Sequence, residues 1–600
     1  MGGALSDAGA AAALRAVERG LNGLPELLGP NGHGIGSNSW VLAGSRTTTG
    51  KPMLANDPHL GPSAPSTWYQ IGLHCSEVTA ECPFDVSGFS FSGLPGIVIG
   101  HNARVAWGFT NLGPDVTDLY LEKLTGDEYE LDGRQVKVER RTEKIKVAGG
   151  KTVTITVRST GNGPLLSDRE DDLRRIGAKA PVADDGTPAS RSERPATGYG
   201  VALRWTALDP GRTADAIFAL NAARDWATFR TAARLFAVPA QNLVYADVDG
   251  NIGYQAPGDI PLREVGDGRW PAPGWLSKYQ WRGRVPFEAL PSVLNPPSGY
   301  VAAANQEVVR AEYPYLLTTD WDYGYRSERI AELVTGPEKF DVAAMQRAQF
   351  DSRNGNAEQL VPRLLTVEAP ERARSAQDLL RDWDHTQPAN SAPAAYFNAT
   401  WRHLLARTFD ELPDSKQPDG GGRWFEVVRG LLAEPDSPWW DDQETDAKEQ
   451  RDDVLRDAMG DAYDELAKRQ GSDLSGWRWG DLHTLELRNQ TFGKSGVGPV
   501  EWLFNRGPYP AAGGDSIVNA TGWSAPDGYG VDWVPSMRMV VDLGDLDRSR
   551  WVNLTGASGH AFHRYYTDQI EPWRVGETTP MRWERSAIER SAKHRLALVP

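Results

Sequence analysis

The pair Gly36-Ser37 is the first place in this chain where the residue types could support covalent chemistry. It stands where the loop LGPNGHGIG gives way to the strand-like run SNSWVLAGS. A serine hydroxyl attacks an amide effectively only when a base accepts its proton. A serine after a glycine is also a common turn residue, so the pair alone does not separate a nucleophile from a turn.

Other catalytic signatures fail when their spacing is tested. The run GKS at 493–495 lacks the earlier glycine of a phosphate-binding loop, and GHGIGS at 32–37 lacks the last glycine of a dinucleotide motif. No HExxH, CxxC or GxSxG is present. The run DVDGN at 247–251 lacks the glutamate of a calcium loop. The ten histidines are scattered, which argues against a zinc or iron enzyme.

The composition is that of a folded protein, with 40% apolar and 24% charged residues among 600. The formal charge of −16 argues against a general nucleic-acid-binding surface. The 22 tryptophans and 62 glycines favour a turn-rich, partly β protein. No run approaches the roughly 20 apolar residues of a membrane span. We therefore expect neither a nucleic-acid nor a membrane partner.

The two cysteines and the N-terminus leave alternatives open. Cys75 and Cys82 are too few for a disulfide framework or a four-cysteine zinc site. They either pair across a loop or are two buried small hydrophobic residues. The first residues predict an Ala-rich amphipathic helix capped near Ser6 or Asp7, without an export signal, and the localisation stays open.

The residues from 37 to about 330 read mainly as strands. Short β-branched or aromatic runs alternate with turn signals, and Asp249-Gly250 between two alternating runs predicts a hairpin. The polar stretch 166–199 predicts a surface loop, and 214–236 predicts a helix.

Residues 340–470 change to helix-periodic segments, and the tail returns to strands before a helix near 585–597. No internal repeat is evident. The pattern predicts one α+β body with a helical insertion.

Five motifs in order carry a family resemblance. They are SNSWVLAGSRTTTGKPMLANDPHL, WYQIGLH, LPGIVIGHNARVAWGFTN, YADVDGNIGY and NPPSGYVAAANQ. From Ser37 to near the C-terminus, the chain resembles the β chain of the penicillin acylase family of N-terminal-nucleophile hydrolases. The resemblance implies a four-layer αββα sandwich with the helical insertion at about 340–470.

The same resemblance divides the chain into two parts. Residues 1–36 are expected to be a spacer- or propeptide-like segment, and residues 37–600 the β-chain-like catalytic domain. The family's α chain is largely missing from this sequence. We expect it as a partner, supplied by the chain's own precursor or as a separate polypeptide.

The resemblance also gives Ser37 a mechanism. The family exposes this serine by attack of its hydroxyl on the carbonyl before it, and Gly36 leaves that carbonyl accessible. The freed α-amino group, with a pKa of about 7.7–8.0, then accepts the hydroxyl proton. Nucleophile and base come from one residue, so no His–Asp pair is required.

Four further residues match catalytic positions of the family. Asn305 would donate its side-chain amide, and Asn111 its backbone N–H, to the oxyanion of the tetrahedral intermediate. His59 would accept from the terminal amine or orient the substrate. Arg326 would help to keep that amine neutral. Without the resemblance, Asn305 would be interpreted as a loop-capping amide, His59 as a loop histidine and Arg326 as part of a surface ion pair.

Two more sets of residues are implied. Asp115 and Asp118 match carboxylates that hold a structural calcium ion in some members, although two acidic residues three apart are also a common solvated turn. An apolar acyl pocket would include Leu60, Ile99, Phe109, Trp205 and Gln241; core packing is the alternative for each. No organic cofactor is implied.

We therefore predict an amidohydrolase that releases an acyl group from a small-molecule linear amide through an acyl-Ser37 intermediate. Penicillins, acyl-homoserine lactones and acylated peptides are candidate substrates. The alternative is a truncated, unprocessed relative that acts as a binding protein. A Trp-rich glycosidase would need a carboxylate pair across a cleft and leaves the ordered motifs unexplained.

Overall fold

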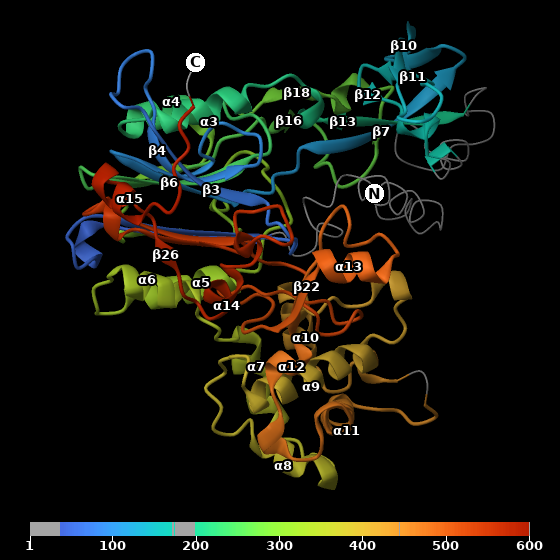
Figure 1. The fold of residues 1–600 in the computed structure, drawn as a ribbon. Coiled ribbons are helices and arrows are strands. Elements are labelled where there is room, and N and C mark those ends of the chain that lie inside the picture. Colours follow the sequence, from blue (N-terminus) through green and yellow to red (C-terminus); the bar gives the residue numbers. More distant parts are fainter. Residues whose placement is uncertain (1–35, 171–172, 175–197, 443–444, 599–600) are drawn as a thin grey trace.

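The computed structural model describes residues 36–170, 173–174, 198–442 and 445–598 (Figure 1). The helix predicted near Ser6 or Asp7 lies outside these residues, as does most of the surface loop predicted at 166–199. Within the described residues, helices and sheets are both prominent, which agrees with the α+β prediction.

The first large sheet carries Ser37 on its strand β1. The strand order is β20-β1-β2-β24-β25-β26, and β23 pairs with β2. Every residue of β1 is buried, because neighbouring strands flank it and both faces of the sheet are covered. The strands are β1 (Gly36–Leu42), β2 (Met53–Leu60), β20 (Tyr300–Ala303), β23 (Val534–Pro535), β24 (Met537–Asp542), β25 (Arg550–Asn553) and β26 (Thr579–Pro580).

The second large sheet has the order β19-β15-β14-β6-β5-β4-β3. Its strands are β3 (Trp68–His74), β4 (Asp85–Phe91), β5 (Ile99–Asn102), β6 (Val105–Asn111), β14 (Gln241–Asp247), β15 (Ile252–Gln255) and β19 (Ser292–Leu294). The hairpin predicted at Asp249-Gly250 is confirmed, since β14 and β15 are antiparallel neighbours. Gly250 has φ +105°, a conformation that favours glycine in such a turn.

The two large sheets pack against each other through one apolar cluster. Val41 and Leu54 from the first sheet and Val105 and Trp107 from the second are fully buried members of it. This contact buries the inner face of β1, where the Ser37 side chain belongs by the two-residue period of a strand.

Helices cover the outer faces of both sheets (Figure 1). Helices α3 (Thr213–Asn221) and α4 (Trp226–Ala233) pack on the second sheet and contribute Ile217 and Phe229 to the same cluster. Helices α5 (Tyr325–Thr335) and α6 (Val342–Gln349) pack on the first sheet in a cluster with Trp40. The single helix predicted at 214–236 is thus two helices, because Asp225 caps α4 in a capping box with Thr228.

Most of the residues predicted as a helical insertion form a separate apolar core below the sheets in Figure 1. Its helices are α7 (Gly355–Leu364), α8 (Arg374–Asp378), α9 (Ala392–Thr408), α10 (Gly422–Leu432), α11 (Arg451–Gln470) and α12 (Trp479–Leu482). Helix α6 falls inside the predicted range but covers the first sheet instead. The division into domains itself stays a prediction.

Smaller elements complete the chain. A five-stranded sheet contains β7 (Thr117–Thr125), β8 (Glu128–Leu131), β9 (Arg134–Lys137), β13 (Tyr199–Trp205) and β17 (Ala272–Pro273). The remaining strands are β10 (Glu139–Ile145), β11 (Val153–Thr160), β12 (Gly163–Pro164), β16 (Pro261–Arg263), β18 (Trp281–Arg284), β21 (Thr484–Leu487) and β22 (Arg506–Pro510). The remaining helices are α13 (Gly498–Phe504), α14 (Ile570–Arg574) and α15 (Arg585–Ser591).

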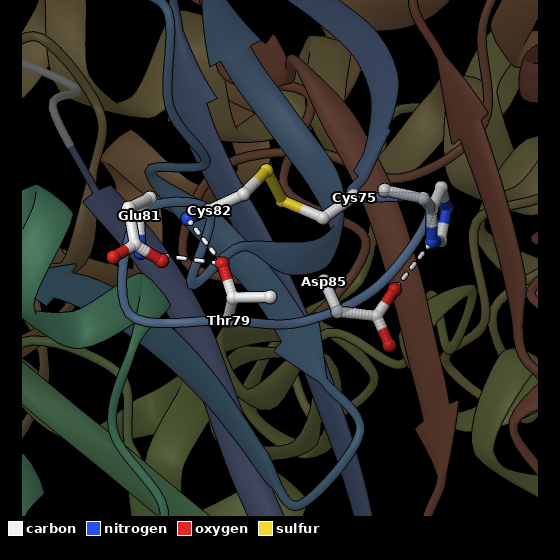
Figure 2. Close-up of a disulfide and its surroundings, with 6 residues drawn as sticks. Cys75, Thr79, Glu81, Cys82 and Asp85 are labelled. Atoms are coloured by element: carbon white, nitrogen blue, oxygen red, sulfur yellow. Dashed lines mark hydrogen bonds and ion pairs between the residues drawn. A yellow bond between two sulfur atoms is a disulfide. The ribbon is translucent and has the colours of Figure 1, made fainter.

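Cys75 and Cys82 form a disulfide in the loop between β3 and β4, as Figure 2 shows. The sequence left two alternatives open for these cysteines, and the structure has the disulfide. Thr79 Oγ1 accepts from the N–H groups of Glu81 and Cys82, both at 3.2 Å, and holds the turn between the cysteines. At the base of the loop, His74 and Asp85 pair at 2.6 Å.

Among the described residues, every helix is too short or too polar to span a membrane.

Candidate active site

The pairing of β1 with β2 fixes which side chains share a face around Ser37. Gly36 lies opposite His59, Ser37 opposite Pro58 and Asn38 opposite Asp57. Because side chains alternate along a strand, Ser37 belongs to the face turned toward the second sheet. Gly36, Asn38, Asp57 and His59 belong to the face turned toward α5 and α6.

Ser37 is 6% exposed and touches the peptide bond that precedes it. Its hydroxyl donates to the carbonyl oxygen of Gly36 at 2.5 Å. Its backbone N–H donates to Asn305 Oδ1 at 2.7 Å. The Ser37 hydroxyl, the Gly36–Ser37 peptide bond and the Asn305 side-chain amide are therefore within hydrogen-bond distance of one another.

Asn305 links the start of β1 to the end of β6. It adopts φ +70°, in the left-handed region, which asparagine tolerates better than most residues. Its Oδ1 accepts from Ser37 N–H and from Arg326 Nη2 at 3.0 Å, while its Nδ2 donates to Asn111 O at 2.8 Å. The structure thus brings Asn305 and Asn111 together beside Ser37. The Asn111 atom that meets Asn305 is the carbonyl oxygen, not the predicted N–H donor.

Arg326, near the start of α5, is 2% exposed, so the surface ion pair considered as its alternative does not apply. Its Nη1 donates to Ser37 O and to Asn38 Oδ1, both at 2.9 Å. Its Nη2 donates to Asp322 Oδ2 at 2.8 Å as well as to Asn305. The Arg326 guanidinium therefore holds the Ser37 carbonyl directly and the Ser37 N–H through Asn305, and it pairs with the Asp322 carboxylate.

His59 is completely buried, and its ring touches Asp57. Nε2 lies 2.9 Å from Asp57 Oδ2. Nδ1 has no hydrogen-bond partner among the described residues. Burial, with the positive charges of Arg326 and Arg538 adding to it, holds the pKa of His59 well below 6.5, so the imidazole is neutral.

Asp57 is a buried carboxyl surrounded by donors. Burial raises its pKa to about 7, although the Arg538 charge and hydrogen bonds from Gln349 and Asn38 act in the opposite direction. Gln349 Nε2 donates to Oδ1 at 3.0 Å and Asn38 Nδ2 to Oδ2 at 2.9 Å.

These last residues were missed at the sequence level. Asn38 and Asp57 stand inside the quoted motifs, and several polar side chains in two buried strands are a signal for a buried network. Gln349 and Arg538 have no such local signal, because only the fold brings α6 and β24 to Asp57.

The predicted acyl-pocket residues are only partly brought together. Ile99 and Phe109 belong to the apolar cluster between the large sheets, and Leu60 packs against it. Gln241 lies opposite Asn111 where β14 and β6 pair. Trp205 is the last residue of β13 in the separate five-stranded sheet and is not a member of that cluster.

Asp115 and Asp118 do not fit a calcium ion, because an arginine lies between them. Arg263 Nη2 lies 2.8 Å from Asp118 Oδ1 and 3.4 Å from Asp115 Oδ1. The Trp281 indole N–H donates to Asp118 Oδ2 at 2.6 Å. A divalent cation between these carboxylates would meet a positive charge already in place. The described residues contain no group of three or more acidic, His or Cys side chains set to hold a metal.

Comparisons with known proteins agree on one family. The family model described as penicillin amidase matches residues 2–590. The chain is 30% identical to an acyl-homoserine lactone acylase, QuiP of Pseudomonas aeruginosa, over 94% of this chain and 69% of the relative. It is also 30% identical to the penicillin acylase 2 proenzyme of Pseudomonas sp. (strain SE83), over 93% of this chain and 68% of the relative.

A solved structure gives the same likeness in three dimensions. The thermostable penicillin G acylase from Alcaligenes faecalis superposes with a TM-score of 0.66, covering 94% of this chain and 99% of that chain. The sequence identity is 21%, so this match speaks for the fold.

Proposed function

The chain belongs to the penicillin amidase family, whose named relatives are amide hydrolases, and on that premise we propose that it hydrolyses a linear amide through an acyl-Ser37 intermediate. The observation that carries this proposal is the position of Ser37. Its hydroxyl lies 2.5 Å from the Gly36 carbonyl oxygen while its N–H donates to Asn305. A hydroxyl held against the preceding carbonyl is the starting arrangement for cleavage of the chain at its own nucleophile.

Self-cleavage is the first step. Ser37 Oγ attacks the carbonyl carbon of Gly36, and the hydroxyl proton passes to the Ser37 nitrogen. The C–N bond breaks while the new C–O bond forms an ester. Water then hydrolyses that ester, leaving a carboxylate on Gly36 and a free α-amino group on Ser37.

Amide hydrolysis repeats the same chemistry on a substrate. The neutral α-amino group, with an ordinary pKa of about 7.7–8.0, accepts the Ser37 hydroxyl proton as Oγ attacks the substrate carbonyl. It returns the proton to the leaving amine, and water cleaves the acyl ester. The Arg326 guanidinium, 2.9 Å from Ser37 O, favours the neutral amine, because a fixed cation disfavours a second positive charge nearby.

The oxyanion of each tetrahedral intermediate needs donors. Asn305 Nδ2 carries two hydrogens, of which one is used by Asn111 O. The second hydrogen, together with the Asn111 N–H, is the donor pair that we propose. Each such donor is typically worth about 3–4 kcal/mol of transition-state stabilisation.

The acyl group is proposed to be apolar, because Leu60, Ile99 and Phe109 gather in the cluster beside Ser37's strand. The relatives named as acyl-homoserine lactone acylases and penicillin acylases suggest two amine components, a homoserine lactone and a β-lactam nucleus. We propose both classes as candidate substrates.

The architecture proposed is the αββα sandwich of N-terminal-nucleophile hydrolases. The packing of α3 and α4, two facing sheets, and α5 and α6 supports it. We also propose residues 37–600 as the catalytic domain after cleavage, with an α chain completing the acyl pocket.

The test is an intact-mass measurement of the wild type and of Ser37→Ala. The wild type is expected to yield a chain that begins at Ser37, and the variant to stay uncut and to hydrolyse neither penicillin G nor an acyl-homoserine lactone. Ser39→Ala is the matched control, because Ser39 is buried on the same face of β1 with its hydroxyl bonded to Ala55 O. Hydrolysis by Ser37→Ala, or an active wild type that stays uncut, would overturn the proposal.

A further inference from the structure

Asp57 and His59 form a buried pair on the face of β1 and β2 opposite to the Ser37 hydroxyl. Both side chains are 0% exposed. The charged groups that face the pair are Arg326 from α5 and Arg538 from β24. The proposed function assigns no role to Asp57.

The hydrogens around Asp57 fix where the His59 proton lies. Asn38 Nδ2 has two hydrogens and three neighbours: Asp57 Oδ2 and Val518 O at 2.9 Å, and His59 Nε2 at 3.2 Å. The two shorter contacts, both to oxygen acceptors, use both hydrogens. With Asp57 ionised, as it is above its pKa of about 7, His59 Nε2 is therefore the donor in its 2.9 Å contact with Asp57 Oδ2. This assignment from the hydrogen-bond network puts the proton of neutral His59 on Nε2.

The other ring nitrogen, Nδ1, then carries the lone pair and lies beside Gly36. A Cβ placed on Gly36 would lie 3.1 Å from His59 Nδ1. Nδ1 has no partner among the residues described. A buried acceptor without a donor is unfavourable, so Nδ1 gains when an N–H or a water reaches it. Cleavage supplies both, because Gly36 is detached and Ser37 acquires an amine.

We propose that Asp57 is a positioning residue that holds His59 with its proton on Nε2, so that Nδ1 accepts a hydrogen bond from the new α-amino group of Ser37, directly or through one water. The inference rests on the proposed function. A neutral amine has two hydrogens and one lone pair. Asn305 Oδ1 and His59 Nδ1 accept the two hydrogens, which leaves the lone pair directed at the Ser37 hydroxyl.

The opposite tautomer would disable the base. With its proton on Nδ1, His59 would donate to the amine and occupy the lone pair that must accept the Oγ proton. Asp57 prevents this state when it is ionised, because an ionised carboxylate can only accept hydrogen bonds. Gln349 and Asn38 hold it in place by donating to its two oxygens.

The decisive experiment is a double-mutant cycle on the processed enzyme. Asp57→Asn can donate its amide to His59 Nε2, which moves the ring proton to Nδ1; we expect kcat to fall by about 100-fold or more with KM little changed. In His59→Gln, the side-chain oxygen of the glutamine can accept from the Ser37 amine, and an amide has no ring tautomers for Asp57 to select. In the His59→Gln background, Asp57→Asn is therefore expected to change kcat by less than about threefold. Asp542→Asn, another buried carboxyl of the same sheet, is the control and should leave kcat unchanged.

A spectroscopic readout covers the case in which Asp57→Asn fails to fold. The ¹⁵N shifts of the imidazole of wild-type His59, identified by their loss in His59→Gln, should show a protonated Nε2 and an unprotonated Nδ1. A protonated Nδ1, or an equal loss of kcat from Asp57→Asn in both backgrounds, contradicts the inference. The proposed function would survive either result, since it fails only if an active wild type stays uncut or Ser37→Ala is active.

Discussion

Ser37 and Asn305 lie 268 positions apart in the sequence, yet the N–H of Ser37 donates to Asn305 Oδ1 at 2.7 Å. The same side chain donates from Nδ2 to Asn111 O at the end of β6. One amide therefore holds the Ser37 nitrogen, which is the proposed base, and keeps a second Nδ2 hydrogen for the proposed oxyanion. The two roles can be separated, because they use different atoms of the side chain.

Asn305→Asp separates them. The carboxylate keeps an oxygen for the amine and suits the left-handed backbone at φ +70°, but it removes the Nδ2 donor. We expect kcat for amide hydrolysis to fall by about 100- to 1,000-fold, the usual effect of losing one oxyanion donor, with KM little changed. Steady-state kinetics on the processed enzyme measure this. Asn295→Asp is the matched control, since Asn295 also has positive φ, at +50°, but lies in a loop away from Ser37; a similar loss there would point to strain instead.

Gly36→Ala is expected to slow self-cleavage. The added Cβ would meet His59 Nδ1 at 3.1 Å, Arg326 Nη2 at 3.2 Å and Asn305 Oδ1 at 3.4 Å, so the groups around the scissile bond must move. Overpacking typically costs about 1–3 kcal/mol, which corresponds to a slowing of roughly 5- to 150-fold if it falls on the reacting geometry. The rate of conversion from uncut to cut chain, followed by gel, is the measurement. Gly430→Ala in α10 meets nothing within 4 Å and should cleave at the wild-type rate.

The site residues that the sequence predicted lie in recognisable motifs, whereas the role of those that were missed depends on contacts made only in the folded chain. Ser37 and Asn305 stand in the ordered motifs and Arg326 matches a further family position, and the structure brings the three together at hydrogen-bond distances. Asp57 stands in such a motif too, but its meaning depends on the register that sets it opposite Asn38. Only tertiary structure specifies that pairing.

The calcium expectation shows the limit of short patterns. Asp115 and Asp118 have a spacing that suits either a metal or a solvated turn, and neither alternative includes Arg263, which lies 145 positions from Asp118. The two-helix break at Asp225 is the reverse case. The capping motif D-x-x-T is visible in the sequence, but the helical pattern on both sides of it favoured the prediction of one continuous helix.

Removing the disulfide should lower stability without lowering activity. Cys75 and Cys82 are separated by seven positions, and closing a loop of this length restricts the unfolded chain by about 2–3 kcal/mol. We expect the double variant Cys75→Ser/Cys82→Ser to lose that much free energy of unfolding in urea while its kcat stays unchanged. A reductant should destabilise the wild type and leave the double variant unaffected. Equal sensitivity of both proteins would show that another effect of the reductant is responsible.

Arg263→Met tests whether the Arg263 guanidinium supplies to Asp115 and Asp118 the positive charge that a calcium ion would otherwise supply. The variant leaves Asp118 and Asp115 close together without their cation, and breaking a buried ion pair costs about 3–5 kcal/mol. We expect millimolar calcium to raise the Tm of the variant but not of the wild type. Arg269→Met is the control, because its pair with Asp267 is largely exposed. Stabilisation of the wild type by calcium, reversed by a chelator, would falsify the arginine assignment.

The pH dependence of stability has an identifiable contributor in Asp515. Burial, with Asp419 and Asp532 nearby, raises the pKa of Asp515 to about 7 from an ordinary value of 3.8. Between these two values the folded state keeps a proton that the unfolded state has released. The stability that Asp515 contributes is therefore present at low pH and is lost as the pH rises toward 7.

Asp515→Asn removes this titration, because the amide is neutral at every pH of interest. The stability difference between variant and wild type begins to open above the unfolded-state pKa of 3.8, and we expect it to widen in favour of the variant by more than about 1 kcal/mol between about pH 5 and about pH 8. Urea unfolding at the two pH values gives both differences, and the buried histidines cancel because they are common to both proteins. Asp436→Asn, at an exposed position, should follow the wild type at both pH values. If the difference between Asp515→Asn and the wild type were the same at both, the carboxyl would be ionised throughout, and the charges of Asp419 and Asp532 would not be acting on it as the structure implies.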